Sequence, residues 1–177
     1  MAHGRSGSEL ARPPCGRGSH LRAIIGAHAT PPTLLYLLDT NVFSEIQKGL
    51  RGHKNVRAWL ESVDDDAVRL SVMTIREVES GVAKLEKTKP EAAAEIALGM
   101  EGLLAAYSGR VIEVNAAVSK EWGRLVGVKG KNHDDMAFAA TARVLGLVLV
   151  TRNVKDFRGR GVRVLDPSAK NPVVVEV

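Results

Sequence analysis

The sequence is poor in the residues that build several common kinds of site. It holds one cysteine, Cys15, which excludes an internal disulfide and a Cys-x-x-Cys metal or redox motif. Aromatic residues make up only 4% of the chain, so extensive stacking on nucleic-acid bases is not expected. No apolar run approaches the ~18 residues that would indicate a membrane span. The chain also lacks a P-loop and a nucleophile elbow, which excludes those two classes of enzyme.

The composition predicts one globular domain preceded by a basic extension. The 177 residues are 45% hydrophobic, which is enough for a core. Residues 1–33 carry four arginines and one glutamate, and so supply +3 of the net charge of +5. They show no helical or strand period, and we interpret them as a disordered extension or an artificial leader. A secretory signal is the competing interpretation, but its apolar stretch at 23–27 is too short, so we expect a cytoplasmic protein.

From residue 34 onward, short apolar runs alternate with segments of helical spacing. Strands are predicted at 34–38, 68–72, 110–114, 147–150 and 162–165, with helical segments between them. Such alternation is typical of an α/β fold with three layers, in which a parallel sheet of about five strands carries helices on both faces. We place this domain at residues 34–168 and expect a C-terminal tail at 169–177.

Four acidic residues follow the predicted strands. Asp39 comes directly after the first strand, Glu77 opens the helix after the second, Asp135 opens the helix at 136–145, and Asp156 follows the fourth strand. Because the carboxyl ends of parallel strands share one edge of a sheet, all four side chains can meet there. Clustered carboxylates oppose folding unless a cation joins them, and an oxygen-only set suits Mg²⁺ or Mn²⁺. Such an ion activates water and neutralises charge on a phosphodiester.

Each acid also has a purely structural interpretation. Helix caps and turns use the same residue types as metal sites do. Capping would account for Asp39 or Thr40, for the Thr74-x-x-Glu77 pair and for Asp134 or Asp135, and a turn would account for Asp156. The common edge and the order of the four acids favour a shared site over four unrelated caps.

Four segments occur in an order that resembles a known family: LLDTNV (37–42), SVMTIREVESG (71–81), DMAFAATA (135–142) and VTRNVKDF (150–157). Together they resemble the motifs of PIN-domain nucleases across residues 34–168, and within that family the VapC and FitB toxins of bacterial toxin–antitoxin pairs. The resemblance implies a Mg²⁺- or Mn²⁺-dependent endoribonuclease, a hydrolase that cuts single-stranded RNA and is inhibited by a cognate antitoxin. It also implies a homodimer or a toxin–antitoxin hetero-oligomer.

The resemblance further assigns roles in the first three motifs. Asp39, Glu77 and Asp135 are carried over as catalytic metal ligands. Thr40 and Asn41 are carried over as residues that support the first aspartate.

The fourth motif leaves one assignment open. Relatives place an acid either where Asn153 stands here or where Asp156 stands, and we favour Asp156 as the fourth catalytic residue. Thr151 and Asn153 are then predicted to support the site. Arg152 and Lys155 are candidates for binding RNA phosphates, although a solvated charged loop would have the same composition.

One departure from the family pattern motivates a second hypothesis. The segment before Asp135, residues 127–133, is polar and several residues shorter than is usual in the family. A shortened loop could leave a catalytically silent PIN-like protein that binds RNA or an antitoxin without cleaving.

Overall fold

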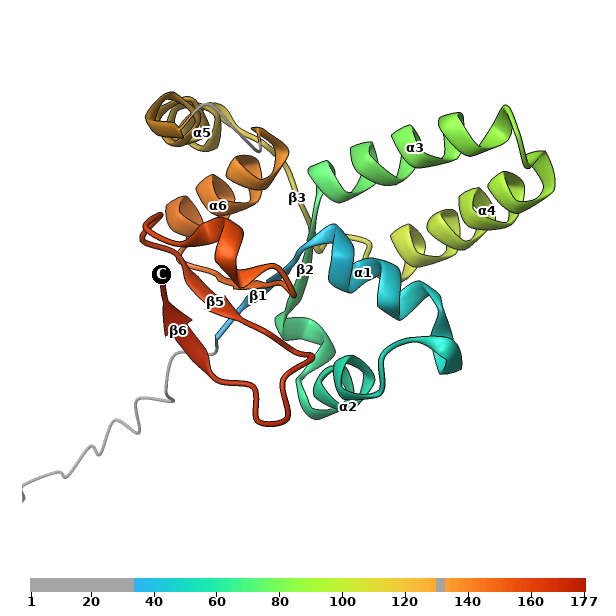
Figure 1. Cartoon of the computed structure of the whole chain (residues 1–177), viewed down its shortest axis with the longest axis horizontal. Helices are drawn as coiled ribbons and strands as arrows, with labels where there is room; N and C mark the ends of the chain where they lie inside the picture. Colours follow the sequence, from blue (N-terminus) through green and yellow to red (C-terminus); the bar gives the residue numbers. More distant parts are fainter. Residues whose placement is uncertain (1–33, 130–132) are drawn as a thin grey trace, which may run out of the picture. The chain divides into compact units, whose positions relative to one another are not determined.

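A six-stranded sheet in the order β3-β2-β1-β4-β5-β6 forms the centre of the domain (Figure 1). The computed structural model describes residues 34–129 and 133–177, so the predictions made for residues 1–33 and for part of the 127–133 loop lie outside the described residues. The strands are β1 (Tyr36–Leu38), β2 (Val68–Ser71), β3 (Val111–Ile112), β4 (Val148–Val150), β5 (Arg163–Leu165) and β6 (Val174–Glu176).

The first five strands run parallel to one another, as predicted, and β6 pairs antiparallel with β5. The prediction of a C-terminal tail at 169–177 is therefore wrong for Val174–Glu176. The short valine run at 173–175 supplies the β-branched side chains that favour an edge strand. Backbone hydrogen bonds of 2.9 Å between Val162 and Val177 extend this pairing.

Helices cover both faces of the sheet, which confirms the three-layer prediction. The helices are α1 (Thr40–Gln47), α2 (Lys54–Ser62), α3 (Val72–Glu86), α4 (Pro90–Ala106), α5 (Ala116–Lys129) and α6 (His133–Leu145), with 3₁₀ turns η1 (Gly49–Arg51), η2 (Asp65–Ala67) and η3 (Val154–Phe157). Consecutive strand residues point to opposite faces. Leu37 packs with α5 and α6, and Leu38 packs in a second core with α1 to α4.

The ends of two helices differ from the sequence prediction in ways that affect the acids. Ser71 is the N-cap of α3, because its Oγ accepts a hydrogen bond from the Met73 backbone N–H at 3.1 Å. The second strand therefore ends at Ser71, and Glu77 lies in the second turn of α3. Helix α6 begins at His133, so Asp135 lies inside its first turn. Within the described ranges, no helix is long and apolar enough to cross a membrane.

Candidate active site

The candidate site begins where β1 and β4 end side by side. Leu38 is paired with Val150 in the parallel register, so the next residue of each strand, Asp39 and Thr151, emerges at the same edge. The Asp39 backbone N–H donates to the Val150 carbonyl at 3.0 Å and continues the ladder by one residue. The register of the sheet thus brings together two residues that are 112 positions apart in the sequence.

The Asp39 carboxylate is buried among neutral hydrogen-bond donors. Its side chain receives the Thr151 hydroxyl at 2.6 Å and the Asn41 amide at 2.5 Å, both on Oδ2. Asp39 occupies the N-cap position of α1, yet its side chain makes no capping hydrogen bond. Burial raises the pKa of Asp39, against the lowering effect of the Thr151 and Asn41 hydrogen bonds. The backbone N–H groups of Thr40 and Asn41 also lower this pKa, so the carboxylate acts on the sheet edge and on the start of α1.

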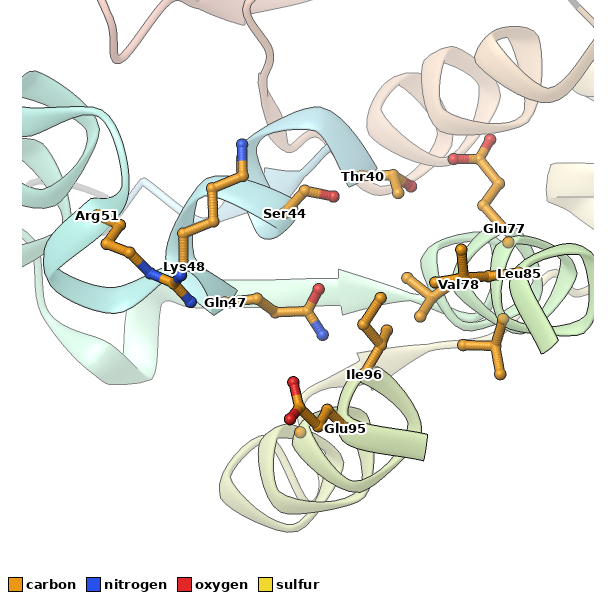
Figure 2. A pocket seen from close by; sticks show the side chains of 13 residues that line it. Thr40, Ser44, Gln47, Lys48, Arg51, Glu77, Val78, Leu85, Glu95 and Ile96 are labelled. Atoms are coloured by element: carbon orange, nitrogen blue, oxygen red, sulfur yellow. The ribbon is translucent and has the colours of Figure 1, made fainter. Parts of the chain in front are cut away.

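Glu77 reaches the same region from α3. The capping-box interpretation of Thr74 and Glu77 is wrong, because Ser71 caps α3 and both residues lie inside the helix. The pKa of Glu77 is raised chiefly by burial and further by the negative charges of Asp39 and Asp134. Figure 2 shows Glu77 and Thr40 at the same end of a cavity. The Thr40 hydroxyl is buried there and makes no hydrogen bond of standard geometry with a described residue, but it lies close enough to the Glu77 carboxylate to lower the pKa of Glu77.

Asp135 is the residue on which the charges of the other acids converge. Burial raises its pKa to about 6, and the negative charges of Asp39, Asp156 and Glu77 contribute in that order. Its neighbour Asp134 forms an ion pair with Arg76 of α3, with Nη1 and Oδ2 2.7 Å apart. The two adjacent aspartates therefore face different surroundings, one a cation and the other the acid cluster.

The fourth motif lies in the loop after β4. Thr151 is fully buried and accepts a hydrogen bond from the Asn153 backbone N–H at 3.0 Å. The Asn153 side chain is exposed, and Asp156 is half-buried within η3. Lys155 is exposed and forms no ion pair with a described residue. Of the two candidates for the fourth position, Asp156 is thus the one whose charge acts on the cluster.

Sequence reasoning missed Glu45, a buried carboxylate on α1 that is 9% exposed. Its Oε1 lies 2.9 Å from Nη1 of Arg152, the residue next to Thr151 in the fourth motif. A signal for it was available, since Glu45 falls between Val42 and Ile46 on the apolar stripe of the helix. A charged residue in such a position is expected to be paired.

The donors at the site fit a hard divalent cation. They are carboxylate and hydroxyl oxygens, no ion pair with a described residue neutralises Asp39, Glu77 or Asp135, and the buried Thr40 hydroxyl lies beside Glu77. In the part of the chain that the structure describes, no three His, Cys, Asp or Glu side chains stand close enough together to hold one ion. Mg²⁺ suits such a spacing, because it is commonly held by one or two carboxylates and keeps several waters.

A cavity of about 630 Å³ opens beside the acids, between α1, α3 and α4 (Figure 2). Thr40 and Glu77 lie at one end of it, and Lys48 and Arg51 at the other. Apolar side chains of α3 and α4 line the space between these ends: Val78, Val82, Leu85 and Ile96. A bound molecule would therefore meet Glu77 at one end, two cations at the other, and between them these apolar side chains together with Ser44, Gln47 and Glu95.

Comparison with known proteins assigns the family. The model of the PIN domain matches residues 36–160, which is most of the chain. The chain belongs to the PIN-domain family. The match spans the β1, α3, α6 and β4 segments that carry the four motifs of this PIN domain, and it confirms the resemblance seen in the sequence.

Two curated proteins are similar to this PIN domain over most of its length. The VapC ribonuclease Y4jK of Sinorhizobium fredii is 29% identical over 138 residues, which cover 75% of this chain and 97% of the relative. The toxin FitB of Neisseria gonorrhoeae is 31% identical over 140 residues, which cover 75% of this chain and 98% of the relative.

Solved structures of the same kind share the fold. A structure of FitAB bound to a DNA fragment superposes with a TM-score of 0.66 at 28% identity, covering 77% of this chain and 98% of the other. The FitAcB structure from Neisseria gonorrhoeae gives a TM-score of 0.62 at 30% identity, covering 75% and 98%. The likeness thus extends to the VapC and FitB toxins named from the sequence.

Proposed function

We propose that this PIN domain is a metal-dependent endoribonuclease toxin of a toxin–antitoxin pair, which hydrolyses phosphodiester bonds of single-stranded RNA. The observation that carries the proposal is the acid cluster at the carboxyl edge of the sheet. There the charge of Asp39 raises the pKa values of Glu77 and Asp135, that of Glu77 raises the pKa of Asp135, and none of the three forms an ion pair with a described residue. The names of the similar proteins, a ribonuclease and a toxin, support the same activity.

Asp39, Glu77 and Asp135 would hold a Mg²⁺ or Mn²⁺ ion, one or two of them directly and the rest through its waters, and Asp156 would complete the catalytic acids. The chemistry expected from the ion is neutralisation of charge on the phosphodiester and activation of an attacking water. Asn41 and Thr151 orient Asp39 by donating hydrogen bonds to its Oδ2.

The residues around these acids would hold the RNA and keep the site in place. Thr40 adds a buried hydroxyl oxygen next to Glu77, and the Asn153 backbone N–H fixes the Thr151 hydroxyl by donating to it. Arg152 and Lys155 project from the same loop with exposed side chains, where they can contact phosphates of the substrate.

The test is cleavage of labelled single-stranded RNA by purified protein with Mg²⁺, with Mn²⁺ and with a chelator, beside the Asp39→Asn variant. We expect cleavage by the wild type with either metal, and little with the chelator or with the variant. Equal cleavage by both proteins would sink the assignment, because it would indicate a contaminating nuclease.

A second candidate is a silent PIN-like protein that binds RNA or an antitoxin without cutting. The short, polar segment at 127–133 favours it, because that segment must still deliver Asp135 to the metal. Calorimetric titration with Mn²⁺ distinguishes the two functions. Saturable binding that is lost in Asp39→Asn supports the nuclease, and no heat at millimolar Mn²⁺ supports the silent protein.

The proposed partners are RNA, a small antitoxin protein and a second copy of the chain. FitB, a relative at 31% identity, occurs in the FitAB complex, which supports a hetero-oligomer for this chain. The apolar lining of the cavity next to Glu77 offers a protein partner a place from which to block the acids. An RNA target and an antitoxin of this kind would place the protein in the cytoplasm. Size measurement after co-expression with the neighbouring small reading frame tests the complex.

A further inference from the structure

Glu45 organises a second charged cluster next to the acids. Its Oε1 accepts a hydrogen bond from Lys48 Nζ at 2.8 Å and another from Arg152 Nη1 at 2.9 Å, and its Oε2 accepts the His53 backbone N–H at 2.8 Å. The Lys48 and His53 hydrogen bonds lower the pKa of Glu45 to about 2. Glu45 is therefore an ionised group that links α1, the start of α2 and the loop after β4.

Both the backbone and the side chain of Arg152 are hydrogen-bonded to side chains of α1. Its backbone N–H donates to the Asn41 amide oxygen at 3.2 Å, and its guanidinium reaches Glu45 one helical turn further on. Asn41 and Thr151 in turn donate to the Asp39 carboxylate. The position of the guanidinium relative to Asp39 is thus fixed through a short chain of hydrogen bonds.

The two cations outnumber the carboxylate that holds them. Lys48 and Arg152 share one oxygen of Glu45, so the cluster keeps a net charge of +1. The two side chains are 52% and 38% exposed, and each has donors left for another partner. Lys48 also lines the cavity that ends at Glu77, so the cluster borders the space next to the acids (Figure 2).

We propose that Glu45 is a positioning residue that holds Arg152 and Lys48 side by side as a binding site for a phosphate of the RNA strand next to the cutting site. This inference rests on the proposed nuclease function. An acid cluster repels the RNA backbone, and fixed cations beside it offset that repulsion. A guanidinium fork and an ammonium group are also the side-chain groups that most often bind phosphate.

The competing explanation is that Glu45 only neutralises the two cations. The two explanations predict opposite signs for Glu45→Gln. Removing a negative charge near bound RNA strengthens binding if Glu45 merely screens its neighbours. It weakens binding if the two cations need Glu45 to hold them in place.

The test is fluorescence anisotropy of a labelled single-stranded RNA with wild type and variants, in a chelator and over a range of salt concentrations. Arg152→Ala and Lys48→Ala should each weaken binding about fivefold and reduce the slope of log affinity against log salt by about 0.7, as expected for one lost phosphate contact on a single strand. Glu45→Gln should weaken binding about threefold although it removes a negative charge. Glu95→Gln is the matched control, because Glu95 lines the same cavity and pairs with no described cation. It should bind equally well or more tightly.

The double variant Glu45→Gln/Arg152→Ala separates positioning from a general loss of structure. Its loss of affinity should be smaller than the two single losses combined, because the Glu45–Arg152 interaction is already lost in each single variant and only the contact of Glu45 with Lys48 remains to be lost. Arg152→Lys keeps the charge but not the fork, and should recover only part of the affinity. Melting curves identify any variant that has lost its fold. If Glu45→Gln is such a variant, the salt slopes of Lys48→Ala and Arg152→Ala still test the phosphate site.

Tighter binding by Glu45→Gln, or unchanged slopes in both cation variants, overturns the inference. If the wild type cleaves RNA with Mn²⁺ while the variants bind like the wild type, only the inference fails. If the wild type neither binds nor cleaves RNA, the proposed function fails as well.

Discussion

Asp39 and Glu45 are two buried carboxylates at opposite ends of α1, 5% and 9% exposed, and their surroundings act on them in opposite directions. The side chains that donate to Asp39, Asn41 and Thr151, are neutral, and burial raises its pKa. Glu45 is held by two cations and a backbone N–H, and its pKa is lowered to about 2. Low solvent exposure thus gives opposite electrostatic outcomes: loss of hydration is the largest effect on the pKa of Asp39, whereas at Glu45 hydrogen bonds outweigh it.

The difference lies in the depth of the two groups and in the charge of their partners. Burial opposes the charged form of any carboxylate, and only opposite charge or strong donors offset it. At Glu45 the compensation comes from the chain itself, so the group can act as a fixed structural element. At Asp39 the neighbouring charges are those of Glu77 and Asp135, whose pKa values the Asp39 carboxylate raises, so that end of the helix is suited to an added cation.

The largest expected effect is on RNA cleavage. Asp39→Asn should lower the rate with Mn²⁺ by more than about 100-fold, because even an outer partner of a metal ligand contributes about 10–100-fold. Glu45→Gln should act mainly on KM, since Glu45 positions groups that bind substrate. Initial rates over a range of RNA concentrations check both. Losses of similar size in kcat for the two variants would contradict the separation of the two regions.

The next effect is on stability. Removing the charge of Glu45 should lower Tm, whereas removing that of Asp39 should leave Tm unchanged or raise it. Glu45→Ala removes three hydrogen bonds to a charged group and should lower Tm by about 5 °C. Asp39→Asn removes a buried charge that has no cation, so without metal it should melt at the wild-type temperature or above. Calorimetry in a chelator makes the comparison. A lower Tm for Asp39→Asn would mean that the chain already compensates Asp39.

The contrast also explains how much the sequence could predict. The parallel sheet and the position of Asp39 follow from apolar runs that end abruptly, and these are local features. Glu45 is paired with Arg152, which is 107 positions away, and no local pattern gives the partner of a buried charge. The antiparallel strand Val174–Glu176 was missed because three valines followed by a glutamate also suit a tail.

The capping alternatives were decided by geometry that spacing does not contain. Thr74 and Glu77 have the spacing of a capping box, but the N-cap of α3 is Ser71, three positions before Thr74. Asp134 and Asp135 are adjacent in the sequence, and only the approach of Arg76 from α3 separates their surroundings. How closely the acids approach one another depends on side-chain conformations and could not be predicted.

The raised pKa values predict a pH dependence of stability. The pKa of Asp135 is about 6 in the fold against an ordinary value of 3.8, because burial and the neighbouring acids favour the neutral form. The folded protein then binds the proton more tightly than the unfolded chain, so stability falls as the pH rises through this window. The stabilisation that Glu45 provides changes with pH in the opposite direction. It is lost as the pH falls from the ordinary pKa of 4.5 toward the lowered pKa of about 2.

Melting curves of the metal-free wild type and Asp135→Asn at about pH 5 and about pH 7 isolate this group. The Tm of the wild type should fall relative to the variant between the two values. Added Mn²⁺ should raise the wild-type Tm more at about pH 7, where the carboxylates are ionised, than at about pH 5. If the metal raises Tm equally in Asp135→Asn, its binding does not involve this residue.

The smallest expected effect tests how rigid the Glu45 cluster is. A Cβ on Gly52 would lie 2.2 Å from the Glu45 carbonyl oxygen, and a backbone atom cannot move aside as a flexible side chain can. The φ angle of Gly52 is −70°, which alanine adopts freely, so any loss comes from that contact alone. Gly52→Ala should therefore displace the neighbouring His53 N–H from Glu45, lower Tm by a few degrees and raise KM slightly.

Gly102→Ala on α4, where a Cβ meets nothing within 4 Å, is the matched control and should stabilise by about 0.4–1 kcal/mol. If both substitutions stabilise the protein, the chain around Glu45 shifts without loss, and the cluster is not the fixed element that positioning of Arg152 requires.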